Sequence, residues 1–230
     1  PGAHQLRIAV VEEGAPLEEL PEHRVHRREQ ALGREARHGG WNPVLFRPTE
    51  GPLMLFYKVG PSPSEWWGML TTSRDAGRTW AEPSELGESQ RLGQGNTHLV
   101  GPVKNKPIQL GDGSILCGSS TEHNSWRVHF ERMRRKEGTG GWKVMQVIGP
   151  INQPSGIFDA IQPTILRHGH ATLQALCRSR QEVIVCTWSR DDGETWTELE
   201  ATDLPNPNAG IDGVTLEDGR HLLVYNHTTR

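Results

Sequence analysis

The chain has 230 residues, including 26 glycines and 16 prolines, and carries a formal net charge of −3. This charge gives no general attraction to nucleic acid, so no nucleic-acid partner is expected. No apolar run is long enough to span a membrane, so no membrane span is expected either. Because glycine and proline interrupt helices, the composition excludes a helical bundle and favours an all-β protein with many turns.

Residues 1–38 form a charged N-terminal segment that does not fit the pattern of the rest of the chain. Its centre, 22–29, is dense in arginine, histidine and glutamate and lacks the alternation of polar and apolar residues typical of strands. We interpret 1–38 as a mobile arm or as the remnant of a first repeat unit, and 39–230 as the folded domain.

Beyond residue 38, a polar residue followed by proline or glycine and an aliphatic run recurs four times. The copies are Asn42-Pro43-Val44, Lys106-Pro107-Ile108, Gln162-Pro163-Thr164 and Asp212-Gly213-Val214. A glycine turn and a second apolar run follow each copy, at Glu50-Gly51, Asp112-Gly113, His168-Gly169 and Asp218-Gly219. Since glycine accepts positive φ, each copy predicts a β-hairpin.

An octapeptide with the pattern S-x-D-x-G-x-T-W occurs twice, 116 positions apart, and a degenerate copy at 135–142 lies between them. The residues that fit the fixed positions of the pattern are Ser73, Asp75, Gly77, Thr79, Trp80, Ser189, Asp191, Gly193, Thr195 and Trp196. The Ser, Asp and Thr side chains can bond backbone amides of the turn, glycine can take the left-handed conformation, and tryptophan can pack on a sheet. The acidic ladder of a calcium loop is missing, so we interpret the motif as structural and predict neither metal nor cofactor.

Together these signals predict units of four strands, in which the octapeptide joins the third strand to the fourth. A unit of about 50–58 residues with this content is typical of a β-propeller blade. Residues 39–230 therefore hold about four blades.

The two octapeptides resemble the Asp-box (BNR) repeats of the sialidase superfamily, and the resemblance covers about residues 39–230. Longer strings support it, among them 41–46, 55–60, 101–107 and 204–212. The resemblance implies a six-bladed propeller with its active site at the mouth of the central channel. There, three arginines would bind the carboxylate of a sialic acid, with a tyrosine nucleophile, a glutamate beside it and an aspartate as general acid and base.

Only part of that site can be matched to this sequence. Arg178 matches one clamp arginine and Arg230 falls where a second would stand. Gln162 occupies the place of the expected glutamate, and an amide cannot deprotonate a tyrosine although it can orient one. No tyrosine or acid/base aspartate matches the family pattern, so the catalytic residues stay unassigned.

The repeat phase supplies further candidates for the channel mouth. Asn42, Lys106, Gln162 and Asp212 open the first strand of each unit near the axis, where each can contact a ligand or serve as a structural hydrogen-bond partner. Asn105 adjoins Lys106 and is a further substrate-binding candidate. Glu122 ends a strand at the place that matches Arg178 one unit later, and Glu122 and Asp212 are the two catalytic candidates.

We expect a sialidase-like exo-glycosidase that removes a terminal acidic sugar from a glycan by a retaining mechanism. Two alternatives remain: a non-catalytic propeller that serves as a binding or assembly module, or a glycosidase or lyase of the same fold that acts on another uronic-acid glycan. Four blades do not close a six-bladed ring. The chain is therefore expected to be a portion of a longer protein, or to have another chain covering its open side.

Overall fold

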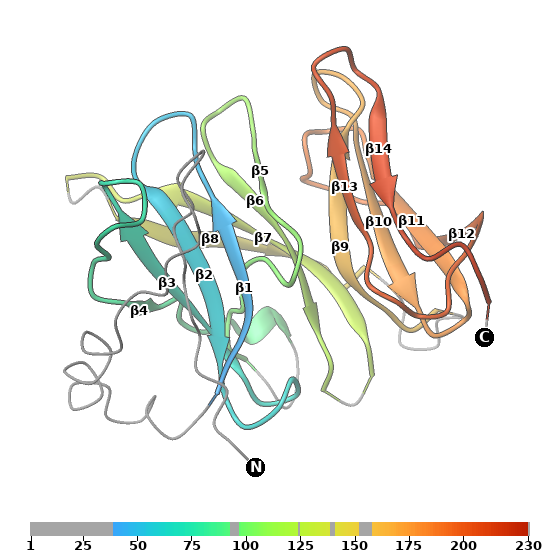
Figure 1. Cartoon of the computed structure of the whole chain (residues 1–230), viewed down its shortest axis with the longest axis horizontal. Helices are drawn as coiled ribbons and strands as arrows, with labels where there is room; N and C mark the ends of the chain where they lie inside the picture. The colour runs from blue at the N-terminus through green and yellow to red at the C-terminus, as the bar shows by residue number, and fades with distance from the viewer. Residues whose placement is uncertain (1–38, 93–96, 124, 139–140, 152–157, 230) are drawn as a thin grey trace, which may run out of the picture.

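The computed structural model describes residues 39–92, 97–123, 125–138, 141–151 and 158–229, and the regular structure there is almost entirely β-strand (Figure 1). One short 3-10 helix, η3 (Gln90–Leu92), interrupts the strands. Within these residues, no helix has the length and hydropathy needed to cross a bilayer. The proposed N-terminal segment 1–38 and Arg230 lie outside the described residues.

The strands form four antiparallel sheets that follow one another along the chain. The first sheet contains β1 (Gly40–Phe46), β2 (Leu53–Val59), β3 (Trp67–Ser73) and β4 (Ser84–Glu85). The second contains β5 (Ile108–Gln109), β6 (Ile115–Thr121), β7 (Arg127–Arg135) and β8 (Trp142–Ile148). The third contains β9 (Ala160–Arg167), β10 (Leu173–Ser179), β11 (Val183–Ser189) and β12 (Glu200–Pro205), and the last is the pair β13 (Asp212–Thr215) and β14 (His221–Val224).

Each sheet packs its apolar face on the next sheet in sequence, so the core is a series of three interfaces. Phe56 and Met133 lie in the cluster between the first and second sheets, and Phe130 and Leu173 in the cluster between the second and third. Leu166 and Ile211 belong to the cluster that joins the third sheet to the last hairpin. The all-β architecture and the repeated four-strand unit predicted from the sequence are confirmed.

The predicted hairpins are present, and the residues that open them introduce a bulge. The glycine of each first turn has positive φ, for example 117° at Gly51 and 80° at Gly113. Asn42 and Gln162 also have positive φ, 45° and 58°, at equivalent irregularities in the pairing of β1 with β2 and of β9 with β10. A bulge re-aims side chains at the end of a strand, here at two of the predicted candidate residues.

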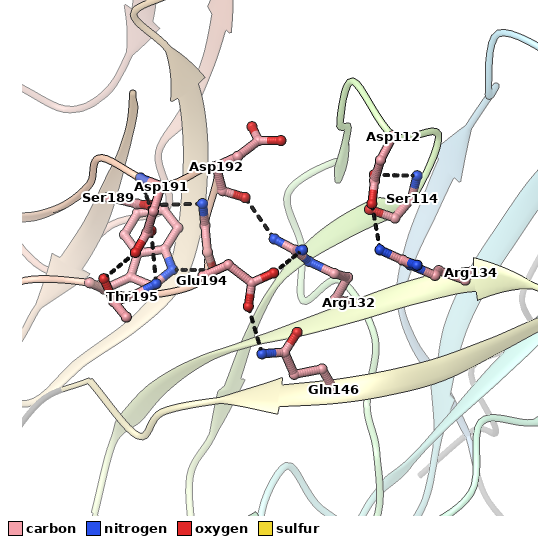
Figure 2. Close-up of polar contacts among 12 residues, drawn as sticks. Asp112, Ser114, Arg132, Arg134, Gln146, Ser189, Asp191, Asp192, Glu194 and Thr195 are labelled. Atoms are coloured by element: carbon pink, nitrogen blue, oxygen red, sulfur yellow. Dashed lines mark hydrogen bonds and ion pairs between the residues drawn. The ribbon is translucent and has the colours of Figure 1, made fainter. Parts of the chain in front are cut away.

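The two Asp-box motifs fold as the sequence predicts. In the second copy, Ser189 Oγ accepts the amide of Gly193 at 2.8 Å, while Asp191 accepts the amide of Thr195 at 2.9 Å and its hydroxyl at 2.5 Å (Figure 2). The first copy repeats these bonds. One detail differs from the expectation, because Asp192 as well as Gly193 has positive φ, and the same holds one residue before the glycine in the first copy.

The second Asp-box also fastens its sheet to the preceding one. Arg132 of β7 donates to the backbone oxygen of Asp192 at 2.7 Å and forms an ion pair with Glu194, which in turn accepts a bond from Gln146 of β8 at 2.9 Å (Figure 2). Trp196 stacks on Phe130 with ring centroids 4.0 Å apart. The motif is therefore a device for sheet-to-sheet packing as well as a turn.

The last hairpin is joined to the third sheet by a pair of histidines. His221 Nε2 and His168 Nδ1 lie 3.2 Å apart, and the second ring nitrogen of His221 contacts the Thr215 hydroxyl at 3.1 Å. Desolvation, followed by the neighbouring His168 ring, lowers the pKa of His221 below its ordinary value of 6.5. A proton on His221 is therefore disfavoured in the folded chain.

We expect acidification to loosen this junction. The folded chain binds a proton at His221 less readily than the unfolded chain does, so the stability contributed by the neutral pair is present above about pH 6.5 and falls as the pH drops below it. The pair is partly exposed, so the effect is about 0.5 kcal/mol or less. Urea unfolding between about pH 7 and pH 5 measures it. His221→Gln should reduce the pH dependence, His170→Gln should not, and an unchanged dependence in His221→Gln would contradict the assignment.

Candidate functional site

Most of the candidate residues gather at one edge of the sheets, where first strands begin and second strands end. This edge lies along the bottom of the view in Figure 1, and the hairpin turns and the Asp-box loops lie at the opposite edge. The ends of β6 and β10 and the starts of β9 and β13 meet there. The sheets thus bring together residues that are up to 107 positions apart in sequence.

Arg178 lies near the end of β10, where it is partly buried. One guanidinium nitrogen donates to the backbone oxygen of Asn208 at 3.1 Å, and the guanidinium carbon lies 5.2 Å from the centre of the Trp126 ring. The Nε atom is buried and has no hydrogen-bond partner in the structure. Arg178 is therefore fixed by its neighbours and retains a free donor.

Trp126 was not among the residues predicted for the site. It follows the loop after β6 and is 8% exposed, and the guanidinium of Arg180 lies 4.3 Å from its ring centre. Two arginines thus pack on one indole, an arrangement that holds cations by attraction to the ring face. A single tryptophan in a loop gives no sequence signal for this role.

Glu122 follows β6 directly, as predicted, and lies beside the two arginines. Burial raises the pKa of its carboxyl above the ordinary value, against the opposing effects of Arg178, Arg180 and a hydrogen bond from the Trp126 indole. A half-buried carboxyl with a raised pKa is suited to proton donation.

Gln162 is positioned through its backbone, which leaves its side chain unpaired. Its carbonyl accepts the side-chain amide of Asn105 at 2.8 Å, and its own amide donates to Ser120 Oγ at 3.3 Å. The side chain is 8% exposed, and its oxygen has no hydrogen-bond partner. Asn105 is fully buried and supports the bulge rather than offering its amide to a ligand.

Lys104 adds positive charge next to this group. Its ammonium donates to Asn105 Oδ1 at 3.1 Å and to the backbone oxygen of Ile211 at 2.8 Å. Desolvation is the main cause that lowers the pKa of Lys104, Asp212 opposes it, and Arg178 and Lys106 add to it. These couplings show that the cations share one electrostatic environment.

Lys106 and Asp212 form an ion pair between the second sheet and the last hairpin. The ammonium lies 3.0 Å and 3.2 Å from the two carboxylate oxygens. Asp212 also accepts bonds from the Thr164 hydroxyl at 3.2 Å and the Gly213 amide at 2.8 Å. Because its carboxylate oxygens are already bonded, Asp212 is suited to hold the two sheets together and to balance the charge of Lys106. Of the two catalytic candidates, Glu122 is therefore better placed for proton transfer.

Other predicted residues are not part of this group. Asn42 occupies the equivalent bulge in the first sheet, but no interaction among the described residues connects it to Arg178 or Gln162. The two tyrosines of the chain lie elsewhere: Tyr57 in β2, and Tyr225 beside the apolar cluster of the last hairpin. Neither lies where a nucleophile next to Arg178 is needed.

A cavity of about 560 Å³ opens at the opposite edge, among the hairpin turns, and Arg167, Trp142 and Gln109 contribute to its wall. Arg167 is already bonded to Asp192 at 3.3 Å and to the backbone oxygen of Gln109 at 3.3 Å. None of the residues predicted for the site lies there. The charged and polar residues therefore favour the Arg178 edge as the candidate site.

Comparison with protein families places the fold. The family model of the BNR repeat-like domain matches residues 20–230. The chain belongs to this family. This family agrees with the BNR-repeat assignment that the octapeptides indicate. No curated protein matches the chain at the level of sequence.

Solved structures with the same fold include sialidases. A protein of unknown function from Dyadobacter fermentans is 15% identical with a TM-score of 0.63, over 81% of this chain and 57% of that one. The Hadza microbial sialidase Hz136 is 17% identical with a TM-score of 0.59, over 84% and 41%. The NanB sialidase from Streptococcus pneumoniae is 19% identical with a TM-score of 0.54, over 75% and 25%. The BNR repeat-like chain therefore spans between a quarter and somewhat over half of these proteins, and at such identities the likeness concerns the fold.

Proposed function

We propose that residues 39–230 form about four blades of a six-bladed sialidase-type propeller that binds the terminal acidic sugar of a glycan, and that the complete protein hydrolyses it with retention. The observation that carries the proposal is the cation group around one half-buried carboxyl: Arg178 and Arg180 beside Glu122, with Lys104 next to them. A carboxylate ligand suits such a group, because a guanidinium binds it through paired hydrogen bonds.

The proposed chemistry divides the charges at the site between binding and proton transfer. Arg178 and Lys104 would hold the sugar carboxylate, and Glu122 would donate a proton to the departing oxygen and later accept one from water. Its raised pKa keeps the carboxyl protonated to higher pH than a free glutamate. Retention also needs a nucleophile, which in this proposal comes from outside residues 39–230.

A second function is favoured by two observations. Gln162 carries a neutral amide, and neither Tyr57 nor Tyr225 lies at the site, so the same cations could serve a propeller that binds an acidic glycan without cleaving it. The cation group suits a uronic acid as well as a sialic acid.

Three apolar residues of the last hairpin, Val214, Leu222 and Val224, are exposed, the last by 66%. We propose that a further blade or another chain packs there.

The test is hydrolysis of a fluorogenic sialoside and of a fluorogenic glucuronide by the full-length protein. We expect turnover of one of them, and Glu122→Gln should lower kcat by about 100-fold or more while binding persists, because proton transfer contributes about that much. Glu137→Gln, in an exposed turn, is the matched control. Binding without turnover in the wild type would support the binding module, and absence of both would contradict both functions.

A further inference from the structure

At the Arg178 edge, Arg178 and two of its neighbours each have a buried polar atom without a hydrogen-bond partner: the Nε of Arg178 and the side-chain oxygens of Gln162 and Asn208. The Nδ2 of Asn206, two residues before Asn208, is likewise unpaired. Buried polar groups in folded proteins are almost always paired, so each unpaired one calls for a missing partner. Two of these four atoms are acceptors and two are donors. A partner that satisfies the atoms of Gln162, Asn208 and Arg178 must offer hydrogen-bond donors next to an acceptor.

The three residues are linked in space by the fold. Ile161 is paired with Arg178 across β9 and β10, and Gln162 follows at the bulge. Arg178 in turn is bonded to the backbone of Asn208. The residues that carry the unpaired atoms are therefore neighbours at one edge of the third sheet.

The backbone holds Gln162 in a conformation that the sequence alone would not favour. Its φ of 58° is rare for a residue with a side chain, and two hydrogen bonds to Asn105 and Ser120 keep it there. Strain of this kind persists where the surroundings fix it, and it clusters at ligand sites. Neither of these backbone bonds uses the amide side chain, so that group is left for a ligand.

We infer that Gln162 sets the specificity of the site: its Oε1 accepts a hydrogen bond from a hydroxyl of the bound sugar while the sugar carboxylate lies on Arg178. Asn208 Oδ1 supplies a second acceptor for a hydroxyl. The inference rests on the proposed binding of an acidic sugar. The ligand class it names is a polyhydroxylated sugar acid that presents its carboxylate and at least one neighbouring hydroxyl on the same side.

A neutral amide has a physical advantage over a carboxylate at this position. Both can accept a bond from a hydroxyl, but a carboxylate next to Arg178 would compete with the sugar for the guanidinium and would repel its negative charge. Because Gln162 is neutral, it adds no further negative charge to that of Glu122 beside Arg178. The residue thus favours capture of an anion over activation of a protein group.

The experiment compares two replacements of Gln162 in the full-length protein by calorimetric titration. The probes are N-acetylneuraminic acid and D-glucuronic acid, each alongside its methyl ester, which keeps the hydroxyls and removes the charge. Gln162→Leu removes the acceptor, so we expect about a tenfold loss of affinity for the acid that binds and a comparable loss for its ester. Gln162→Glu keeps an acceptor and adds a charge, so we expect about a tenfold loss for the acid and no loss for its ester.

Gln174→Glu is the matched control, because Gln174 lies in the same pair of strands and its amide faces His168 away from the site. It should leave both affinities unchanged. If the wild type binds an acid and both Gln162 variants bind it equally well, the role of Gln162 is wrong while the proposed function stands. If the wild type binds neither acid, the proposed function fails and the inference with it.

Discussion

Glu131→Ala is expected to lower the free energy of unfolding by about 3–5 kcal/mol, the range found when one member of a buried charged network is removed. Glu131 lies in β7 and is completely buried. Its two oxygens accept the backbone amides of Val100 at 2.9 Å and Gly101 at 2.8 Å, and His129 lies 3.1 Å from one of them. The alanine would leave these donors without partners inside the core.

The loss of hydrogen-bond acceptors is only one part of this cost, because Glu131 also balances the charge of a buried cation. Lys58 of β2 is fully buried and donates to the backbone oxygen of Pro102. Burial lowers the pKa of Lys58 to about 8, and the negative charge of Glu131 opposes that shift. Removing the carboxylate therefore leaves a charged ammonium in the core or forces it to lose its proton.

Urea unfolding of the full-length protein measures this change in the free energy of unfolding. It is monitored by a spectroscopic signal that reports on this domain. Glu131→Gln keeps the shape and one acceptor, so its cost should be smaller, about 1–3 kcal/mol. Glu137→Ala, at an exposed position, should stay within about 0.5 kcal/mol of the wild type. A Glu131→Ala variant as stable as the Glu137→Ala variant would show that the network does not stabilise the fold.

The parts of the fold that could be predicted from the sequence are those encoded by residues close together in the chain. The Asp-box is one case, since Asp191 bonds the amide and hydroxyl of Thr195 only four residues away. The hairpins are another, because a glycine such as Gly113 is needed at positive φ whatever the rest of the chain does. Local interactions of this kind can be predicted without knowing how the neighbouring sheets pack.

The candidate site could be predicted only in part. Repeat phase placed Gln162, Lys106 and Asp212 at one common edge, because equivalent strands begin at the same edge of successive sheets. It did not show that Lys106 and Asp212 neutralise each other, since they are 106 positions apart and meet only through packing of the sheets. The same phase placed Asn42 among them, although no interaction among the described residues connects Asn42 to Gln162.

Trp126 and Glu131 show what a single sequence does not reveal. Each acts on partners from another segment: Trp126 on the two arginines at the end of β10, and Glu131 on the loop at Val100 and Gly101, about 30 residues away. A tryptophan in a loop and a glutamate in a strand with several charged residues are both common in folded proteins, and neither by itself indicates a special role. Only the approach of two sheets distinguishes these residues from others of their type.

Arg178→Ala is expected to weaken binding of an acidic sugar by about 30-fold or more, which corresponds to the lower end of the roughly 2–5 kcal/mol lost when one partner of a desolvated charge pair is removed. Arg178→Lys is the sharper variant, because it keeps the positive charge but loses the planar fork that binds a carboxylate through two parallel bonds. It also loses the Nε donor that is unpaired in this structure. We therefore expect Arg178→Lys to lose about tenfold in affinity or more.

Titration of the full-length protein with N-acetylneuraminic acid and with D-glucuronic acid checks both values, and circular dichroism checks that each variant folds. Arg190→Ala removes an exposed arginine at the opposite edge, in the second Asp-box, and should bind as the wild type does. If Arg178→Lys binds as tightly as the wild type, the site requires positive charge alone and not the geometry of the guanidinium. If Arg178→Ala does so too, the carboxylate lies elsewhere, and the cations at this edge serve only to hold the sheets and loops together.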